Sequence, residues 1–193
     1  MGEDKAFLAL GGRTLLVRAL ELAKSVAREV YIVGEAAKFA GFGMIVEDVY
    51  RQHGPLAGIH AALVHSTTEL NLMLAVDLPF VEPGFLQYLV SQAHAWKATV
   101  TVPQVAGRWQ PLCAVYRREF REIADKSLGE GKNKIDALFS PWLTRALTEQ
   151  EMAQHGFSPE MFRNLNTPED LQAARVYDGV HGGKPGSATD SAK

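Results

Sequence analysis

Two spacings of apolar residues recur along the chain. Between residues 13 and 28, Leu16, Leu20 and Ala23 follow one another at intervals of three and four, which places them on one face of an amphipathic helix. The segment Asn71–Val76 (N-L-M-L-A-V) is instead a mostly apolar run without alternation, as in a strand covered on both faces of a parallel sheet. The pattern therefore predicts helices and buried strands in one chain.

The other segments follow the same two patterns, with proline and glycine at their ends. The further strands expected are 29–34, 44–46, 99–103 and 112–116, and the further helices are 54–64, 83–95, 117–128, 135–139 and 168–175, with Thr167 as the N-cap of the last. This alternation in a chain of 193 residues predicts one α/β domain with three layers, α/β/α, and a mostly parallel sheet.

Composition narrows the class of protein and its boundaries. From residue 177 to 193 the chain is mostly Gly, Ser, Lys, Thr, Asp and Ala, too few large apolar residues to offset the entropy of ordering. We therefore expect a domain at 1–176 and a disordered tail at 177–193. The formal charge of −2, with interspersed signs, offers no basic field for nucleic acid.

Membrane insertion and secretion are not indicated either. No apolar run approaches the roughly 18 residues of a membrane span, and the amino terminus lacks a basic segment followed by an apolar one. The single cysteine, Cys113, cannot form an internal disulfide and stands in an apolar run, where a buried thiol is the simplest interpretation. A cytoplasmic protein fits these features best.

Two acids end predicted strands, and ligands of such sheets bind beyond the carboxyl ends of the strands. Asp77 follows the run 71–76, and Asp48 follows the run 44–46. Oxygen ligands with room for water and phosphate suit Mg²⁺ bound to a nucleotide, and Asp77 is the better metal candidate. The alternatives are a turn residue ahead of Pro79 for Asp77 and a solvated loop acid for Asp48. Asp4 and Lys5, near a chain terminus, are likewise more simply interpreted as solvated charges on spacing alone.

Three further segments carry residues suited to binding. At 54–58, G-P-L-A-G could bring backbone amides to an anion at a helix start, or could serve close helix packing. Gln110 and Pro111 could contact a polar heterocycle or form part of a hairpin. Asn164 and Asn166, on one face of an extended segment, could pair with a heterocycle edge or brace neighbouring loops.

Taken together, these segments resemble the molybdenum cofactor guanylyltransferase family over residues 1 to about 176. The motifs are M-G-E-D-K-A at 1–6, E-D at 47–48, G-P-L-A-G at 54–58, V-D-L-P at 76–79, Q-P at 110–111 and N-L-N-T-P-E-D-L at 164–171. The resemblance implies a Rossmann-like nucleotide-diphospho-sugar transferase fold. It also implies transfer of GMP from GTP to molybdopterin with release of pyrophosphate, and molybdoenzymes or molybdopterin-handling proteins as partners.

Roles for individual residues follow from the same resemblance. Lys5 matches the lysine on the GTP phosphates and Asp77 the Mg²⁺ ligand, so these two are the expected catalytic residues. Asp48 matches the nucleotide-binding acid, and Gly54, Pro55 and Gly58 belong to the matching G-P-L-A-G motif. The resemblance assigns Gln110, Pro111, Asn164 and Asn166 to the pterin side.

The chain departs from the family pattern in two places. The family has a strand and a glycine-rich loop, L-A-G-G-x-S-x-R, directly before the lysine motif, whereas this sequence starts at Met1. We expect Met1 to be an internal methionine, with about 20 upstream residues restoring strand and loop. Relatives also often carry asparagine at the end of the strand after the first helix, where this chain reads Ile32-Val33-Gly34.

Three other interpretations stay open on the sequence. A cytidylyltransferase would consume CTP in place of GTP. A non-catalytic, truncated pterin-binding module would bind the pterin without affinity for GTP. A chain that lacks a central strand could also fail to fold cooperatively, because open sheet edges and apolar faces are costly to a marginally stable domain.

Overall fold

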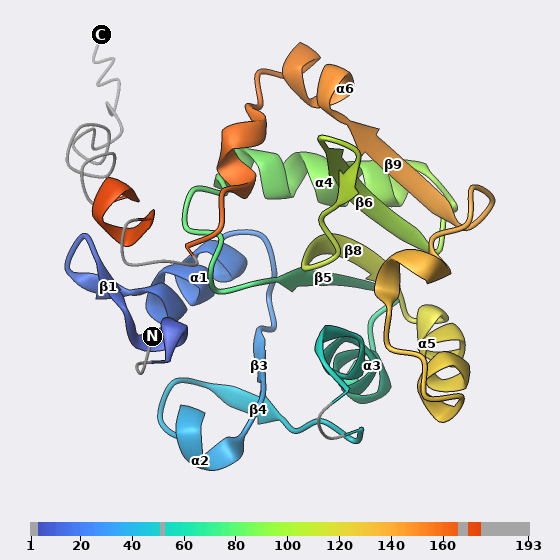
Figure 1. Ribbon diagram of the computed structural model, residues 1–193, viewed down its shortest axis with the longest axis horizontal. Helices are drawn as coiled ribbons and strands as arrows, with labels where there is room; N and C mark the ends of the chain where they lie inside the picture. The colour runs from blue at the N-terminus through green and yellow to red at the C-terminus, as the bar shows by residue number, and fades with distance from the viewer. Residues whose placement is uncertain (1–3, 51–52, 166–169, 175–193) are drawn as a thin grey trace, which may run out of the picture.

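The computed structural model describes residues 4–50, 53–165 and 170–174, which form helices on both sides of a central sheet (Figure 1). The main sheet has the order β5-β8-β6-β7, with β9 also paired to β6. These strands are β5 (Leu70–Leu74), β6 (Val100–Val105), β7 (Arg108–Trp109), β8 (Cys113–Arg117) and β9 (Thr144–Thr148). Because β8 is antiparallel to both β5 and β6, and β9 is parallel to β6, strands β5, β6 and β9 share one direction.

Two smaller sheets lie on the amino-terminal side. Strands β3 (Tyr31–Val33) and β4 (Met44–Val46) pair in parallel. Strands β1 (Ala9–Leu10) and β2 (Arg13–Thr14) form a hairpin. No pairing of the described residues joins β3 to β5, so the sheet is interrupted between these two strands.

The helices cover the main sheet on both faces. On one face, α3 (Pro55–His65) and α5 (Phe120–Gly129) enclose a core with Ile59, Val102 and Tyr116. On the other, α4 (Pro83–Ala95) and α6 (Glu149–Gln154) enclose a second core with Phe85 and Leu147. The remaining helical elements are α1 (Leu15–Lys24), α2 (Ala36–Phe39), and the 3₁₀ turns η1 (Lys5–Phe7), η2 (Ile135–Leu138) and η3 (Pro159–Phe162).

The predicted α/β architecture is confirmed, and several elements match closely. Helix α4 and strand β4 have the predicted bounds. Helix α1 is shorter than the predicted 13–28: it begins after Thr14, whose hydroxyl caps it by accepting from the backbone N–H of Val17, and it ends at Lys24. The segment expected as a helix at 135–139 is the 3₁₀ turn η2.

Strand β9 and helix α6 were not predicted. Thr144–Thr148 places two threonines and an arginine among only two apolar residues, a weak strand signal, yet it pairs along the whole of its length with β6. The signal for α6 was present: Thr148 accepts from the backbone N–H of Glu151 at 3.2 Å, the threonine-x-x-glutamate arrangement of a capping box. Sheet pairing thus supplies what the local pattern of β9 lacks.

Residues 170–174 are helical, within the predicted final helix. The predicted N-cap Thr167 and the predicted tail 177–193 lie outside the described residues. Cys113 is a buried free thiol, as expected, and burial raises its pKa to about 12. Within the described ranges, the helices are all too short or too polar to cross a membrane.

Candidate active site

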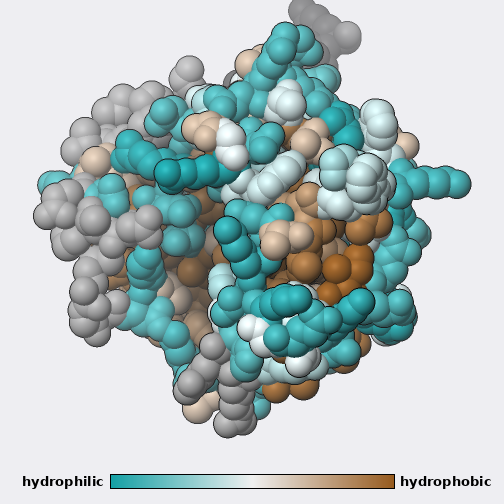
Figure 2. All heavy atoms as spheres, turned by 45° about the vertical axis from the view of Figure 1, so that its right-hand side comes forward, coloured by the Kyte–Doolittle hydropathy of each residue, from teal (hydrophilic) through white to brown (hydrophobic). Residues whose placement is uncertain are grey.

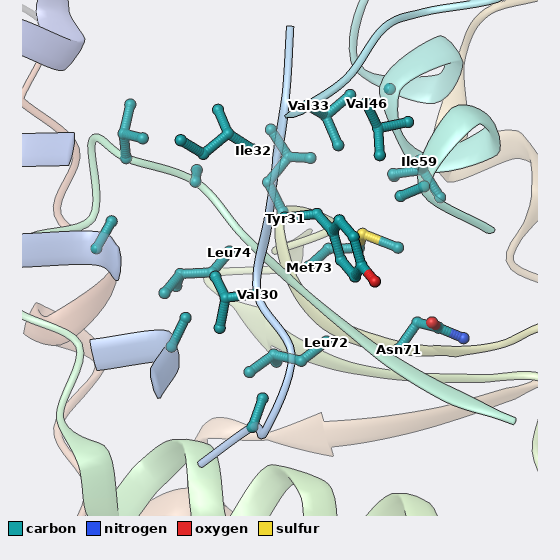
Figure 3. A pocket seen from close by; sticks show the side chains of 18 of the residues that line it. Val30, Tyr31, Ile32, Val33, Val46, Ile59, Asn71, Leu72, Met73 and Leu74 are labelled. Atoms are coloured by element: carbon teal, nitrogen blue, oxygen red, sulfur yellow. The ribbon is translucent and has the colours of Figure 1, made fainter. Parts of the chain in front are cut away.

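A cavity of about 1040 Å³ lies at the interruption between β3 and β5. Its walls are the two strands, the helices α1 and α3, and the turn η1. The close-up shows apolar side chains of both strands around it, among them Ile32 and Leu72 (Figure 3). The charged side chains Lys5, Asp48 and Asp77 also line it, so the cavity combines apolar walls with a group of charges from three separate parts of the chain.

Lys5 and Asp77 approach each other in this group. The Nζ atom of Lys5 lies 4.0 Å from Oδ2 of Asp77, and both side chains are partly exposed. Lys5 is the first residue of η1, whose preceding residue, Asp4, accepts a hydrogen bond from the backbone N–H of Ala6 at 2.9 Å. The other oxygen of Asp4 pairs with Lys38 of α2. Asp4 therefore fixes the turn that carries Lys5.

Asp77 is held through its backbone by a distant segment. Its carbonyl oxygen accepts a hydrogen bond from the N–H of Leu165 at 3.1 Å, and Leu165 itself is buried. Two residues earlier, the N–H of Ala75 donates to the carbonyl oxygen of Leu112 at 2.7 Å. The end of β5 is thus tied to two loops that lie far away in the sequence, one of which contains Asn164.

Asp48 is the least well compensated charge of the group. Its Oδ1 atom is buried and has no hydrogen-bond partner within the part of the chain that the structure describes. Burial raises the pKa of this carboxyl above its ordinary value. Oδ1 would lie 3.7 Å from a Cβ atom placed on Gly58, an ordinary contact distance, so the carboxylate lies beside helix α3.

Helix α3 begins beside the same group. Gly54 precedes it with a φ of 69° and a ψ of −160°, a conformation that glycine adopts without strain. Pro55 is the first helical residue, where its missing N–H costs no hydrogen bond. Gly54, Pro55 and Gly58 all line the cavity, and the start of this 11-residue helix therefore offers its dipole to an anion there.

The structure brings most, but not all, of the sequence-predicted residues together. Those that line the one cavity are Lys5, Asp48, Gly54, Pro55, Gly58 and Asp77. Gln110 and Pro111 are outside its lining, in the connection between β7 and β8. There the N–H of Gln110 donates to the carbonyl oxygen of Pro103, and the carbonyl oxygen of Pro111 accepts from the Tyr116 hydroxyl. Asn164 is exposed, and Asn166 lies outside the described residues.

Sequence reasoning missed two members of the charged group, Asp4 and Lys38, which both line the cavity and pair with each other. Lys38 gave no signal, because the four-residue helix α2 is too short for a periodic pattern. The departure at Gly34 also has a local reason. A Cβ atom there would lie 2.7 Å from the ring of Phe39, so no side chain fits while that ring stays in place.

Comparison with known proteins assigns the family. A model described as the MobA-like NTP transferase domain matches residues 1–149, more than three quarters of the chain. The chain belongs to the MobA-like NTP transferase family. The matched region contains Lys5, Asp48 and Asp77, whereas Asn164 lies beyond it.

Individual relatives agree with this MobA-like assignment. The chain is 30% identical over 179 residues to the molybdenum cofactor guanylyltransferase of Desulfosudis oleivorans, covering 91% of this chain and 87% of the relative. It is 32% identical to the probable molybdenum cofactor guanylyltransferase of Pelotomaculum thermopropionicum, covering 91% and 86%. The expected family resemblance is therefore confirmed, and the protein is a nucleotidyltransferase by family.

Solved structures support the fold of this MobA-like transferase. Molybdopterin-guanine dinucleotide biosynthesis protein A from Archaeoglobus fulgidus superposes with a TM-score of 0.80 at 24% identity, covering 93% of this chain and 92% of that one. The 2-C-methyl-D-erythritol 4-phosphate cytidylyltransferase of Thermus thermophilus gives 0.67 at 20% identity, covering 91% and 94%. Both likenesses concern the fold, which confirms the predicted Rossmann-like class.

The residues present in this MobA-like transferase are chemically suited to Mg²⁺. Among the described residues, no three His, Cys, Asp or Glu side chains gather into a metal cage. A nucleotide-bound Mg²⁺ needs less, because it takes one or two carboxylates and completes its shell with water and phosphate oxygens. The carboxylate of Asp77 and the unpartnered oxygen of Asp48 are donors of this kind.

Proposed function

We propose that this protein transfers GMP from GTP to the terminal phosphate of molybdopterin, giving molybdopterin guanine dinucleotide and pyrophosphate. The observation that carries the proposal is the pair of Lys5 and Asp77, 4.0 Å apart in a cavity that also receives Asp48 and the start of α3. Relatives named molybdenum cofactor guanylyltransferase, similar over about nine tenths of the chain, support the choice of substrates.

The reaction requires one bond to form and one to break. An oxygen of the molybdopterin phosphate attacks the α-phosphorus of GTP, and a new P–O bond forms. The bond from the α-phosphorus to the oxygen that bridges to the β-phosphorus breaks, and pyrophosphate leaves with that electron pair. Positioning and electrostatic stabilisation contribute most of the catalysis in phosphoryl transfer.

Different residues of the chain provide the positioning and the electrostatic stabilisation. The ammonium of Lys5 offsets the negative charge of the triphosphate, and η1, capped by Asp4, holds that ammonium in place. The amino-terminal end of α3 adds a fixed positive potential. Asp77 would hold Mg²⁺, which when bound neutralises phosphate charge and polarises the phosphoryl group, and Asp48 would contact the nucleotide.

The test is pyrophosphate release from GTP in the presence of molybdopterin and Mg²⁺, measured with this chain and with a version extended at its amino end by a strand and the loop L-A-G-G-x-S-x-R. In whichever of these two chains releases pyrophosphate, hereafter the active form, Asp77→Asn should lower kcat/KM by at least about 100-fold, because it removes a metal ligand. Lys5→Met should raise the KM for GTP by about tenfold, because one charge-assisted phosphate contact is lost.

Two exposed residues outside the cavity lining serve as matched controls: Asp136→Asn and Lys24→Met remove the same groups elsewhere on the surface. Both controls should stay within about twofold of the unchanged chain. Full activity of Asp77→Asn would contradict the metal assignment. Turnover with CTP but not GTP would replace the proposal with cytidylyl transfer, and molybdopterin binding without turnover in either chain would indicate a binding module.

A further inference from the structure

A second cavity lies beside α5, away from strands β3 and β4. Its volume is about 710 Å³, and helix α3 stands between α5 and β3 (Figure 1). It opens between α5 and the segment 132–138, and we call it the α5 groove. Among the described residues, those that line it are all distinct from those that line the cavity at β3 and β5. The α5 groove is therefore a separate feature of the surface.

The floor of the α5 groove is apolar, and its rim carries charges of both signs. The half-buried residues Ile123, Leu138 and Leu143 form the floor. The exposed charged residues around them are Lys126, Lys132, Lys134, Glu122 and Glu130. On the side of the molecule that carries α5, hydrophobic atoms reach the surface within a border of hydrophilic side chains (Figure 2). The groove thus offers apolar surface without a strong field of one sign around it.

Hydrogen bonds within the chain hold the two walls of the groove together. Gly131, with a φ of 72°, turns the chain back after α5. The N–H of Lys132 donates to the carbonyl oxygen of Ser127 at 2.9 Å, and the Ser127 hydroxyl donates to the carbonyl oxygen of Lys132 at 2.9 Å. Ile135 then anchors η2 in the core between α3 and α5. Because the groove is preformed, a partner can bind it without ordering a loop.

Trp142 stands beside this groove, directly before the floor residue Leu143. Its side chain is 85% exposed, more than any other large apolar side chain of the described residues. The other two tryptophans have partners. Trp96 stacks with the guanidinium of Arg145 at 4.7 Å, and Trp109 packs edge to face on a second ring at 5.4 Å. Trp142 is thus a large apolar side chain that the described fold leaves in water.

An exposed indole next to an apolar groove makes a self-complementary surface. In a dimer with two-fold symmetry, each contact between two different residues is made twice. Trp142 of each copy can therefore enter the α5 groove of the other. Each insertion would remove roughly 150–250 Å² of side-chain surface from water. The lysines of the rim would meet the face of the indole, which attracts cations more strongly than other aromatic rings.

The charges on α5 fit the same arrangement. Glu122, Lys126 and Glu130 follow one another at intervals of four residues and so lie along one face of the helix. Because their signs alternate, two antiparallel copies of this face can place lysine opposite glutamate, which avoids like-charge repulsion as the copies approach. A partner of strongly acidic or strongly basic character would lack this match.

We propose that the α5 groove and Trp142 form the interface of a homodimer, in which each copy inserts its Trp142 into the groove of the other. The inference goes beyond the proposed function, because it concerns the association of two chains and not the chemistry of nucleotides. It places the interface on the far side of α3 from strand β3, so that dimer formation leaves the cavity with Lys5 and Asp77 open.

The test is sedimentation velocity of the 193-residue chain, without nucleotide, metal or pterin. A monomer–dimer equilibrium should be visible at chain concentrations up to about 100 µM. Trp142→Ala should raise the Kd of the dimer by at least about 30-fold, because a tryptophan buried at an interface is a typical hot spot. Trp96→Ala removes the same ring at a residue outside the groove lining, and should change the Kd by no more than about twofold.

A second variant tests the groove in place of the tryptophan. Ala137 is exposed and lines the groove, so Ala137→Arg fills the groove without changing the core. It should raise the Kd by at least about tenfold, because the charged side chain competes with the indole for the apolar floor. Ala153→Arg, at an exposed residue of α6 outside the lining, is the matched control and should stay within about twofold. A cooperative melt of each variant shows that it is folded.

Mixing the two weakened variants distinguishes reciprocal insertion from any other contact. The Trp142→Ala chain keeps its groove, and the Ala137→Arg chain keeps its tryptophan. A mixed dimer therefore retains one of the two insertions, whereas a dimer of either variant alone retains neither. Native mass spectrometry of an equal mixture should show the mixed dimer at least about tenfold above either homodimer, compared with about twofold from chance pairing.

Three outcomes would overturn the proposal. A chain that stays monomeric at about 100 µM does not form this interface. A dimer that neither Trp142→Ala nor Ala137→Arg weakens associates through another surface. A mixture with the mixed dimer at its chance level would exclude reciprocal insertion. Because the test contains no substrate, none of these results depends on whether the chain transfers GMP.

Discussion

Single residues around the cavity differ in how well their charges are compensated. Lys5 pairs with Asp77, and Lys38 pairs with Asp4, but all four side chains are partly exposed. Exposed ion pairs contribute little to folding stability, so the main effect of these two pairs is to position the side chains. Asp48 is different, because its buried Oδ1 atom has no hydrogen-bond partner among the described residues. Its charge is a cost to the ligand-free fold that a cation or hydrogen-bond donor could offset.

We therefore predict that Asp48→Asn raises the melting temperature of the ligand-free chain by about 2 °C at neutral pH, while it weakens GTP binding. The pKa of Asp48 is raised by burial, so the folded state holds this proton more tightly than the unfolded state. The ionised residue thus destabilises above the folded pKa, and the penalty shrinks as pH falls through it.

Thermal melts of both chains as a function of pH measure this effect. The difference in melting temperature should be largest at neutral pH and should decline toward zero as the carboxyl of Asp48 becomes protonated. Glu82→Gln, at an exposed position outside the cavity lining, is the control and should show no such pH-dependent gain. A lower melting temperature for Asp48→Asn at neutral pH would show that the carboxylate is satisfied in the fold.

At the scale of elements, the segment after β4 that carries Asp48 is fastened to two helices. The hydroxyl of Tyr50 donates to Oδ1 of Asp125 in α5 at 2.8 Å. His60 of α3 places its Nε2 atom 3.3 Å from the same oxygen, and the rings of Tyr50 and His60 meet edge to face at 5.3 Å. The bond to Asp125 raises the pKa of Tyr50. This three-residue clamp positions the segment of Asp48.

Tyr50→Phe should remove the clamp's hydrogen bond and keep its ring contact. In the active form we expect the KM for GTP to rise about three- to tenfold with little change in kcat, because binding geometry is lost and not the chemistry. The expected loss of folding stability is only about 1 kcal/mol.

Steady-state kinetics and denaturant unfolding of the same preparation test this prediction. Tyr88→Phe is the matched control: it removes a similar hydrogen bond, to Glu151 at 3.0 Å, outside the cavity lining. It should cost comparable stability with an unchanged KM. If both variants raise the KM equally, the effect of Tyr50 is one of general stability and the clamp has no positioning role.

At the scale of the whole molecule, the sheet consists of separate parts. Strands β5, β8, β6 and β9 form a continuous ladder covered by helices on both faces, whereas β3 and β4 form a pair of three-residue strands. The pair is attached through side-chain packing, with Ile32 in a small cluster with Leu16 and Phe39. Isolated two-stranded units are marginally stable in water, so the β3–β4 part depends on the rest of the fold.

Hydrogen exchange without ligand should reveal this difference in local stability between the β3–β4 pair and the main sheet. Amides of β8 and β6 should exchange at least about tenfold more slowly than those of β3, because the latter open in local fluctuations while the former exchange only on larger unfolding. Exchange followed by fragment mass spectrometry resolves the two regions. Equal protection of β3 and β8 would show that the chain unfolds as one cooperative unit despite the interrupted sheet.

The sequence determined the elements whose signal is local. The bounds of α4 and β4 follow from apolar pattern and from proline, and Asp48 and Asp77 could be recognised because each follows a strand. The family resemblance named Lys5. The sequence could not assign Asp4 or Lys38 to the site, since their pairing depends on where η1 and α2 meet. The apolar pattern also did not predict β9, whose only strong signal is the ladder with β6.

Tertiary structure alone decided which of these residues share a site. Lys5, Asp48 and Asp77 are separated by more than 25 residues at each step, and only the packing of η1, β4 and β5 brings them to one cavity. The same packing left Gln110 and Pro111 outside this cavity, which lies between β3 and β5. Local pattern fixes which way a segment folds, because it depends on nearby backbone and side chains. Proximity across the chain depends on how the segments bury their apolar faces together.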